Sequence, residues 1–320
     1  MSSRSPRVTV LMPVHNGEQY LVEAIESVLN QDVGDLELLV IDDGSTDDTP
    51  AILRACPDPR LRVIRLEHTG LIGALNHGLE HARGEFISRM DADDVMSPGR
   101  LGRQLEHFHR YPKAVACGTP YELFGAVEGV VRPPRGNRAC QAHLIFGSSV
   151  PHATVMIRAD VVRAHGLRYR DGYLQAEDFK LFSELARFGE LHNLRHVGLR
   201  YRQHDEQVTR REDAVMRDTH LRICLENLAA RGVRIDDDRM RDLLWPRGGG
   251  PRDAVWYLLN GLPLLLWLGL RSHGPAGAGQ ALLVARERVR VILRREPEPK
   301  PAEPGQDESE ESQPVLEAQP

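Results

Sequence analysis

The run GEFISRMDADD, at residues 84–94, decides the fold and the chemistry that we expect of this chain. Residues 86–90 form a short apolar-rich stretch that predicts a buried strand. Asp91, Asp93 and Asp94 follow that strand at once. Three carboxylates at one strand end repel one another unless a cation lies among them. Oxygen ligands favour Mg²⁺ or Mn²⁺, which in turn bind phosphates. The alternative is a solvated acidic turn that caps the helix expected near Pro98.

On both sides of this run, apolar stretches alternate with segments of helical periodicity. The strands are continuously apolar, which is typical of a mostly parallel sheet covered by helices on both faces, as in Rossmann-like α/β folds. The expected strands are residues 8–12, 36–41, 61–66, 86–90 and 114–117, and the expected helices are residues 18–30, 48–55, 71–82 and 98–111.

Polar clusters follow three of these strands, at residues 13–17, 42–45 and 91–94. Right-handed crossovers bring the carboxyl ends of parallel strands to one edge, where ligands bind in open α/β sheets. The first cluster, PVHNG, precedes a helix whose backbone N–H groups can meet an anion. Neither GxGxxG nor GxxxxGK[ST] occurs at a strand–helix junction, which disfavours a dinucleotide dehydrogenase or a P-loop ATPase. Asp43 is placed to accept hydrogen bonds from a base or ribose; a helix N-cap is the alternative, and it suits Asp47 or Ser45 better.

The second half of the chain has a looser pattern. It predicts an edge hairpin at residues 125–131, helices at 137–146, 207–230 and 236–244, and strands at 153–157 and 198–204. Glu177 and Asp178 open another helix, where acids ordinarily complement the helix dipole. His204 ends the last strand, and a lone histidine is more often structural than a ligand.

The C-terminal part changes character. Residues 254–270 carry no charge, but Asn260, Gly261 and Pro263 interrupt a stretch already at the lower limit for a membrane span. After a break at residues 274–279, residues 280–295 predict a basic amphipathic helix. The pair suggests an interfacial membrane anchor; a helix docked on the protein or on a second copy is the equal alternative. Residues 296–320 are rich in Pro, Glu and Ser and are expected to be disordered.

Charge and cysteine usage exclude other classes of protein. The net charge is −5, and residues 296–320 account for −7 of it, so the remaining 40 basic and 38 acidic residues leave +2. Bulk electrostatic binding to nucleic acid is therefore not expected. The four cysteines form no CxxC pair and are typical of reduced thiols. The polar first residues lack the pattern of a secretory signal peptide, and we expect a cytoplasmic protein.

Five motifs together resemble the family 2 glycosyltransferases, in family order and over residues 7–212. The opening block is VLMPVHNG at residues 10–17, and the second is VIDDGSTD at residues 40–47. MDADD, at residues 90–94, is similar to the metal-binding DxD block. Glu177-Asp178 resembles the ED block that supplies the catalytic base, and residues 202–204, RQH, resemble the late block that closes over the diphosphate.

The resemblance implies a GT-A fold and inverting, metal-dependent transfer of a sugar from a nucleoside diphosphate donor. It gives the acceptor as a hydroxyl of a glycan or a lipid-linked molecule, in cell-surface polysaccharide synthesis. Asp178 would be the base, with Glu177 as second choice. Asp43 would read the base and Asp91 the ribose, which favours UDP over GDP or dTDP. The residues implied for nucleotide binding are Pro13, Val14, His15, Asn16, Asp42, Asp43, Asp91 and Ala92. The ligands implied for Mg²⁺ or Mn²⁺ are Asp93, Asp91, Asp94 and His204, and Arg202 is implied on the diphosphate side.

We expect residues 1–235 to form the GT-A domain, with a nucleotide-binding half at about 7–120 and an acceptor half at about 121–212. A helical extension would follow at 236–295, and its segment 254–295 would contact the inner face of the cell membrane peripherally. A non-catalytic nucleotide-sugar binding or membrane-scaffold protein on the same fold is the alternative. A sugar nucleotidyltransferase would need a Gly-rich basic loop after the first strand, which residues 13–17 do not provide.

Overall fold

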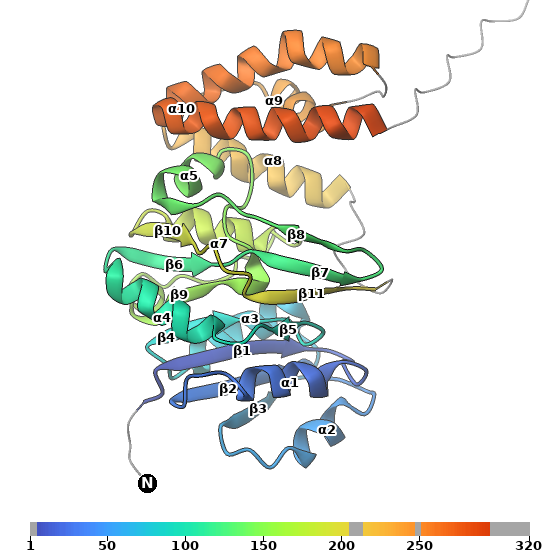
Figure 1. Cartoon of the computed structure of the whole chain (residues 1–320), viewed down its shortest axis with the longest axis vertical. Coiled ribbons are helices and arrows are strands. Elements are labelled where there is room, and N and C mark those ends of the chain that lie inside the picture. The colour runs from blue at the N-terminus through green and yellow to red at the C-terminus, as the bar shows by residue number, and fades with distance from the viewer. Residues whose placement is uncertain (1–4, 205–213, 247–250, 295–320) are drawn as a thin grey trace, which may run out of the picture.

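The structure, a computed structural model, describes residues 5–204, 214–246 and 251–294. Its first half alternates strands and helices as predicted, each within a few residues of the expected bounds (Figure 1). These elements are β1 (Val8–Val14), α1 (Leu21–Leu29), β2 (Leu36–Asp42), α2 (Thr49–Ala55), β3 (Leu61–Arg65), α3 (Gly70–His81), β4 (Phe86–Arg89), β5 (Val95–Met96), α4 (Arg100–Arg110) and β6 (Ala114–Gly118).

The second half adds short strands and further helices. They are β7 (Tyr121–Gly125), β8 (Gly129–Val131), α5 (Gly136–His143), the 3-10 turn η1 (His152–Thr154), β9 (Met156–Arg158), α6 (Ala159–Ala164), α7 (Glu177–Leu185), β10 (Glu190–Asn193), β11 (Leu199–Gln203), α8 (Ala214–Ala229), α9 (Asp237–Leu244) and α10 (Pro251–Arg294). The strand expected at residues 153–157 begins only at Met156, because η1 takes its first residues. The helix expected at 207–230 lies partly outside the described residues, and the acidic tail 296–320 lies wholly outside them.

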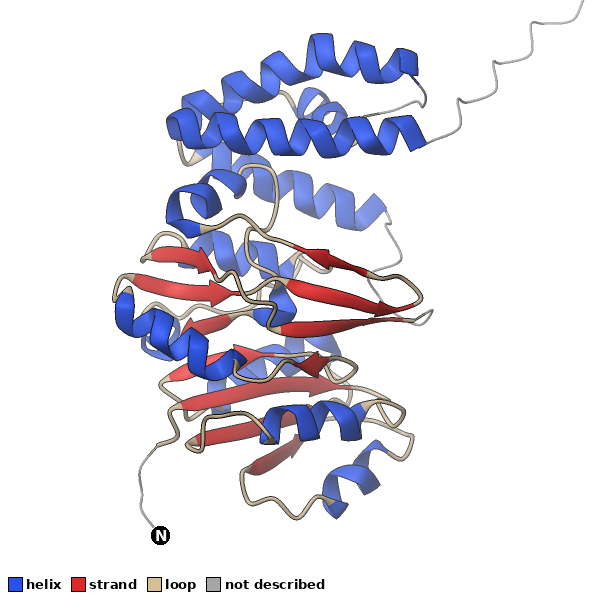
Figure 2. Cartoon of the chain, viewed as in Figure 1, coloured by secondary structure: helices blue, strands red, loops and turns tan. Residues whose placement is uncertain are grey.

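In the described part of the chain, the main sheet has the order β10-β6-β9-β4-β1-β2-β3. Neighbouring strands are parallel except β9, which runs antiparallel to both β4 and β6. Helices cover both faces (Figure 2). Leu11 and Leu39 pack with α3 on one face, while Val10 and Val40 pack with α1 on the other. The predicted α/β class with a mostly parallel central sheet is therefore confirmed.

A second, smaller sheet has the order β5-β11-β7-β8. β7 and β8 form an antiparallel hairpin, so the predicted edge hairpin exists but starts four residues earlier, at Tyr121. β11 pairs in parallel with β7 and antiparallel with β5. Since β5 follows the aspartates of residues 91–94 directly, this sheet brings the end of β11 to those aspartates.

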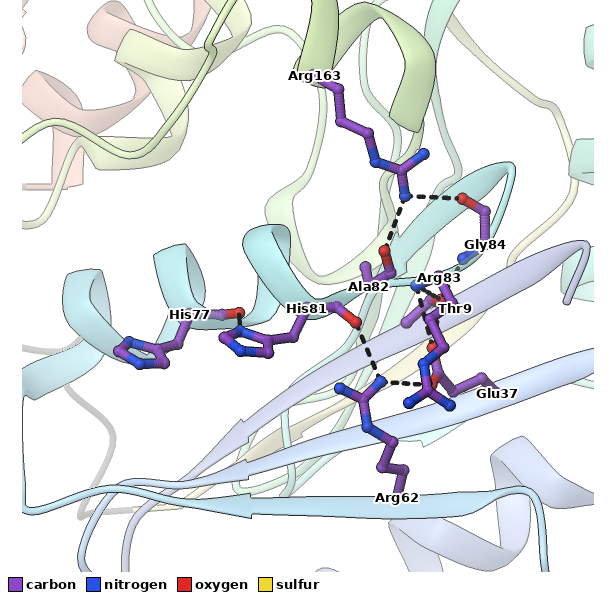
Figure 3. Close-up of polar contacts among 9 residues, drawn as sticks. All are labelled: Thr9, Glu37, Arg62, His77, His81, Ala82, Arg83, Gly84 and Arg163. Atoms are coloured by element: carbon purple, nitrogen blue, oxygen red, sulfur yellow. Dashed lines mark hydrogen bonds and ion pairs between the residues drawn. The ribbon is translucent and has the colours of Figure 1, made fainter. Parts of the chain in front are cut away.

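A polar network at the amino ends of the strands fixes the start of β4 (Figure 3). The buried carboxylate of Glu37 accepts hydrogen bonds from Thr9 Oγ1 at 2.8 Å and from Arg62 Nη1 at 2.7 Å. Thr9 Oγ1 in turn accepts from the backbone N–H of Gly84 at 2.9 Å. A Cβ at Gly84 would lie 2.5 Å from the backbone nitrogen of Thr9, so no larger residue fits there. The start of β4 is thus fixed, and the aspartates follow this strand at its other end.

Two helical segments of α10 form a hairpin at the end of the molecule opposite β3 (Figure 1). Only His273 and Gly274 are non-helical, so the predicted break at 274–279 is too long. The segments cross at a pair of glycines, where a Cβ on Gly269 would lie 2.3 Å from the carbonyl oxygen of Gly277. Tyr257 Oη donates to the carbonyl oxygen of Leu243 at 2.8 Å, which docks the first segment on α9.

Candidate active site

The three polar clusters that follow β1, β2 and β4 lie together, as the parallel order requires. The backbone N–H of Asn16 donates to Ser45 Oγ at 3.0 Å, and the Asn16 side-chain oxygen accepts from the N–H of Thr46 at 2.8 Å. The backbone N–H of Asp43 donates to the carbonyl oxygen of Val14 at 2.8 Å. Ala92 faces the same loop: its Cβ is 3.9 Å from where a Cβ on Gly17 would stand.

Asp91, Asp93 and Asp94 offer carboxylate oxygens that all lie within 4.8 Å of one another. Asp94 is fully buried, and its Oδ2 has no hydrogen-bond partner among the described residues. Burial, reinforced by the charges of Asp91 and Asp93, raises the pKa of Asp94 well above its usual value. An orphaned acceptor among three crowded carboxylates is the environment that a hard divalent cation relieves. The residues present therefore fit Mg²⁺ or Mn²⁺.

The end of β11 closes over this cluster. His204 Nε2 lies 3.0 Å from Asp93 Oδ2, and the backbone N–H of Arg202 donates to Asp94 Oδ1 at 3.0 Å. The Arg202 side chain donates to the carbonyl oxygen of Asp93 at 2.8 Å and pairs with Glu23 on α1. Its guanidinium also stands over the ring of Tyr20, at 4.3 Å. The structure thus brings Arg202 and His204 to the aspartates from 108 or more residues away.

Asp43 has contacts that the sequence did not predict. Its Oδ1 accepts from the backbone N–H of Thr69 at 2.6 Å and from Thr69 Oγ1 at 2.9 Å, and its Oδ2 accepts from the N–H of Gly70 at 2.8 Å. Asp43 therefore satisfies the free N–H groups at the start of α3, a helix far along the chain. A contact between Asp43 and a base remains a prediction, and the base would have to share these oxygens.

The other residues predicted for the nucleotide lie around it. The Asp42 carboxylate is buried and accepts from the N–H of Ser45 at 2.9 Å, with Arg65 at 3.3 Å. Pro13 and Val14 are the last two residues of β1, and both are buried. The exposed ring of His15 lies on the ring of His68, with centroids 4.3 Å apart. The two exposed rings, tilted by 38° to one another, offer aromatic surface to a ligand beside a loop of backbone donors.

Glu177 and Asp178, at the start of α7, form a second acidic group. Asp178 Oδ1 accepts from the N–H of Phe179 at 2.6 Å, and Ser148 Oγ lies 3.5 Å from Asp178 Oδ2. Glu177 is buried, and its Oε2 has no partner in the described residues. Burial, followed by the charge of Asp178, raises the pKa of Glu177 to about 7, and burial also raises the pKa of Asp178. Buried carboxyls with raised pKa values are candidates for proton transfer.

The raised pKa of Glu177 predicts how stability depends on pH. Between the ordinary value of 4.5 and about 7, the folded chain keeps a proton that the unfolded chain has lost. The free energy of unfolding therefore falls as pH rises through that window. Above it, the folded protein carries the full energetic cost of the buried Glu177 carboxylate. Glu177→Gln removes the penalty, so it should stabilise the protein at pH 8 by roughly 1–3 kcal/mol and have little effect at pH 5.

Urea unfolding at the two pH values measures this difference. The matched control is Glu26→Gln on the exposed side of α1, which should change stability by less than about 0.5 kcal/mol at either pH. A Glu177→Gln protein that is less stable than wild type at pH 8 would contradict a buried, penalised carboxylate.

Arg89, the last residue of β4, connects the two acidic groups, and the sequence reading missed it. Its guanidinium is buried and pairs with Asp91, and its backbone carbonyl accepts from the buried Arg100 at 2.8 Å. The positive charge of Arg89 lowers the pKa values of both Glu177 and Asp178 against the effect of burial. The signal was present: a cation ends a buried strand two residues before the first of three acids. Arg89 is thus close enough to act on both carboxylate groups.

We expect Arg89→Gln to destabilise the protein strongly. Removing one partner of a buried ion pair leaves an uncompensated charge and costs about 3–5 kcal/mol. Urea unfolding at pH 7 measures the loss. Arg241→Gln is the control, since Arg241 pairs with Asp218 at the surface, where such pairs contribute about 0–1 kcal/mol. Equal losses in the two variants would show that Arg89 does not balance the buried acids.

Tyr169 and His152 lie in the same region. His152 Nε2 and Tyr169 Oη share a hydrogen bond of 2.8 Å. Burial lowers the pKa of His152 well below its usual value, with Arg89 second, so the imidazole is neutral. Burial also raises the pKa of Tyr169, and the charges of Asp91, Glu177 and Asp178 add to that effect. Tyr169 therefore lies within electrostatic range of both acidic groups, as Arg89 does.

The comparisons with known proteins agree with this geometry. Residues 9–157 match the model of the family described as "Glycosyl transferase family 2". A protein of Haemophilus influenzae, described as an uncharacterized glycosyltransferase, is 32% identical over 238 residues, which cover 70% of this chain and 73% of that protein. The chondroitin synthase of Escherichia coli is 25% identical over 72% of this chain, which spans only 34% of that longer protein.

Solved structures of low sequence identity share the fold. S. aureus TarS in complex with UDP-GlcNAc has a TM-score of 0.60 at 14% identity, covering 90% of this chain and 93% of that one. The mannosyltransferase PcManGT from Pyrobaculum calidifontis, in complex with GDP-Man and Mn²⁺, has a TM-score of 0.55 at 19% identity, covering 90% and 88%. The family match and the relative from Haemophilus influenzae show the family, and the solved neighbours show the fold: the chain belongs to glycosyl transferase family 2 and is a glycosyltransferase with the GT-A fold.

Proposed function

We propose that this glycosyltransferase moves a sugar, with inversion, from a UDP-sugar to a hydroxyl of a glycan or a lipid-linked acceptor. The observation that carries the proposal is that the buried Arg89 links two acidic groups: it pairs with Asp91 and lies close enough to Glu177 and Asp178 to act on their pKa values. One is a crowded cluster with an orphaned oxygen on Asp94, and the other is the buried pair Glu177 and Asp178. A displacement of this kind needs charge neutralisation at the leaving diphosphate and a base at the attacking hydroxyl.

Asp91, Asp93 and Asp94 are the residues that would hold Mg²⁺ or Mn²⁺, and His204 lies within reach of the same place. Such an ion supplies Lewis-acid neutralisation of the negative charge on the leaving nucleoside diphosphate. Among the solved neighbours, PcManGT is in complex with GDP-Man and Mn²⁺. Arg202, which is anchored over the aspartates, adds a second positive charge on that side.

Asp178 is the base in this proposal. The acceptor oxygen attacks the anomeric carbon as the bond from that carbon to the diphosphate oxygen breaks, and Asp178 Oδ2 takes the hydroxyl proton. Its Oδ1 accepts a hydrogen bond from the N–H of Phe179. Its Oδ2 has a long contact of 3.5 Å with Ser148 Oγ, so Oδ2 can accept the proton of the acceptor hydroxyl. Direct attack from the side opposite the leaving group accounts for the inversion. Glu177 remains the second choice for the base.

The relatives support the setting of the reaction. Names among them include chondroitin synthase and a succinoglycan biosynthesis protein of Rhizobium meliloti, and both products are polysaccharides. We infer that this chain acts in cell-surface polysaccharide synthesis on the cytoplasmic side. The solved neighbours hold UDP-GlcNAc in one case and GDP-Man in the other, so the identity of the donor base is decided by a donor panel.

A donor panel tests the proposal. The purified full chain, with Mn²⁺, is incubated with UDP-, GDP- and dTDP-sugars, and the free nucleoside diphosphate is quantified by chromatography. We expect release from one UDP-sugar above the others. Release from a GDP- or dTDP-sugar alone would replace UDP in the proposal, and no release from any donor, with or without a mixture of glycan acceptors, would contradict sugar transfer from such donors.

A further inference from the structure

The first segment of α10 is apolar on the face that points away from the protein. Trp256, Leu259, Pro263, Trp267 and Leu270 recur every three or four residues, which places them along one helical stripe. All are exposed, Leu259 by 70% and Trp256 by 58%. We name these five residues the outer stripe. The hairpin that carries it forms one end of the molecule (Figure 1).

The opposite face of the same segment is already used. Ala254, Tyr257, Leu265 and Leu268 are buried in the core cluster. Docking on the protein, one of the two possibilities open from the sequence, therefore explains the inner face only. A helix that is apolar all round is expected to be buried all round. Contiguous exposed apolar surface with large aromatic rings marks an interaction site.

The second segment adds positive charge to this hairpin. Its exposed side chains include three leucines and two arginines, namely Leu282, Leu283, Leu293, Arg286 and Arg290. Over its whole length α10 carries six arginines against two acids. Beside it opens a cavity of about 720 Å³, and none of the site carboxylates lines it. Arg135 and Arg138, both exposed, line that cavity together with Pro275 and Gly279 of α10.

We propose that the outer face of the α10 hairpin binds the surface of an anionic lipid bilayer. The outer stripe would enter the boundary between headgroups and acyl chains, where tryptophan is favoured, and the arginines would contact lipid phosphates. This goes beyond sugar transfer and does not depend on it. Binding to a second copy is less favoured, because a two-fold contact would bring the arginines of both hairpins together.

The structure of the hairpin indicates that it lies on the bilayer surface and does not cross the bilayer. By length and composition alone, the helix at residues 251–293 passes for a membrane span, since an 18-residue window within it has a mean hydropathy of 1.3, but core helices of soluble proteins pass the same test. The break at His273 and Gly274 divides the helix, and the inner face of the first segment is packed on α9. Packing on one face and apolar exposure on the other is the pattern of an interfacial helix.

Flotation of the full chain with vesicles tests the proposal. One set is phosphatidylcholine, and the other is an equimolar mixture with phosphatidylglycerol. We expect wild type to float with the anionic vesicles, and Leu259→Ser combined with Trp267→Ser to lower the bound fraction by at least about tenfold. The matched control is Val22→Ser combined with Val130→Ser, which removes apolar residues exposed by 49% and 44% on α1 and β8, and should bind as wild type.

A second variant separates charge from apolar contact. Arg286→Gln combined with Arg290→Gln should weaken binding to the anionic vesicles and remove the preference for them. Unchanged melting temperatures show that the variants fold. Wild type that floats with neither vesicle, or a stripe variant that floats like wild type, overturns the proposal. The proposal is also overturned if light scattering shows a wild-type dimer, the stripe variant is a monomer, and wild type does not bind vesicles. The outer face would then bind a second copy. Nucleoside diphosphate release in vesicle-free buffer, measured on the same samples, reports sugar transfer separately.

Discussion

Asp178→Asn should lower kcat by at least about 10²-fold while the KM for the donor stays near that of wild type. A positioned carboxylate base contributes about 10²–10⁴-fold, and an amide cannot take the proton. The donor contacts proposed here lie on the loops after β1, β2 and β4, so they are left in place. Initial rates at saturating acceptor, with the donor varied, measure both constants.

Two controls make this result specific. Glu177→Gln should have a milder effect on kcat, because Asp178 remains. Ser148→Ala should also be mild, since its hydroxyl is 3.5 Å from the carboxylate. If Asp178→Asn keeps a normal kcat and Glu177→Gln does not, the base is Glu177. If Asp178→Asn mainly raises the donor KM, the residue belongs to donor binding.

Asp93→Asn should reduce turnover to background without unfolding the protein. The variant removes one of three charges that the site offers to a cation, and losing such a transition-state contact costs about 10²–10³-fold or more. It also relieves repulsion on the buried Asp94, so stability should not fall. Nucleoside diphosphate release and the melting temperature are measured on the same sample.

Asp160→Asn is the control, because Asp160 is an exposed carboxylate at the start of α6 and should not affect activity. EDTA should reproduce the loss in wild type, and added Mn²⁺ should restore the rate. Full activity in EDTA, or in Asp93→Asn, would contradict a role for the aspartate cluster in holding a metal.

The regular part of the fold was predictable because its signals are local. β1, β2 and β4 are apolar throughout, and the helices between them have apolar residues at helical spacing. The missed elements lack such signals. β5 has two residues and exists only by pairing with β11, and β10 is a polar-rich strand, Glu190–Asn193, that forms beside β6. α6 follows β9 with no Gly or Pro between them.

Only the part of the site that follows from the parallel order of the strands was predictable from the sequence. It places the ends of β1, β2 and β4 together, and they are together. It gives no information on contacts between distant segments, such as Asp43 with Thr69, or Arg89 with the carboxylates of residues 177–178. The one-sided packing of the first segment of α10 was also hidden, because a sequence shows that a helix is apolar but not which face the protein covers.

Calorimetric titration of UDP, GDP and dTDP into the full chain tests most directly the claim that one cation joins the aspartates to the donor. Each nucleotide is titrated with Mn²⁺ and with EDTA, into wild type and into Asp93→Asn. The account predicts that UDP binds wild type at least about tenfold more tightly with Mn²⁺, a difference of about 1.4 kcal/mol, and that Asp93→Asn abolishes the difference. Equal affinity in Mn²⁺ and EDTA, or no binding of any of the three nucleotides, would contradict it.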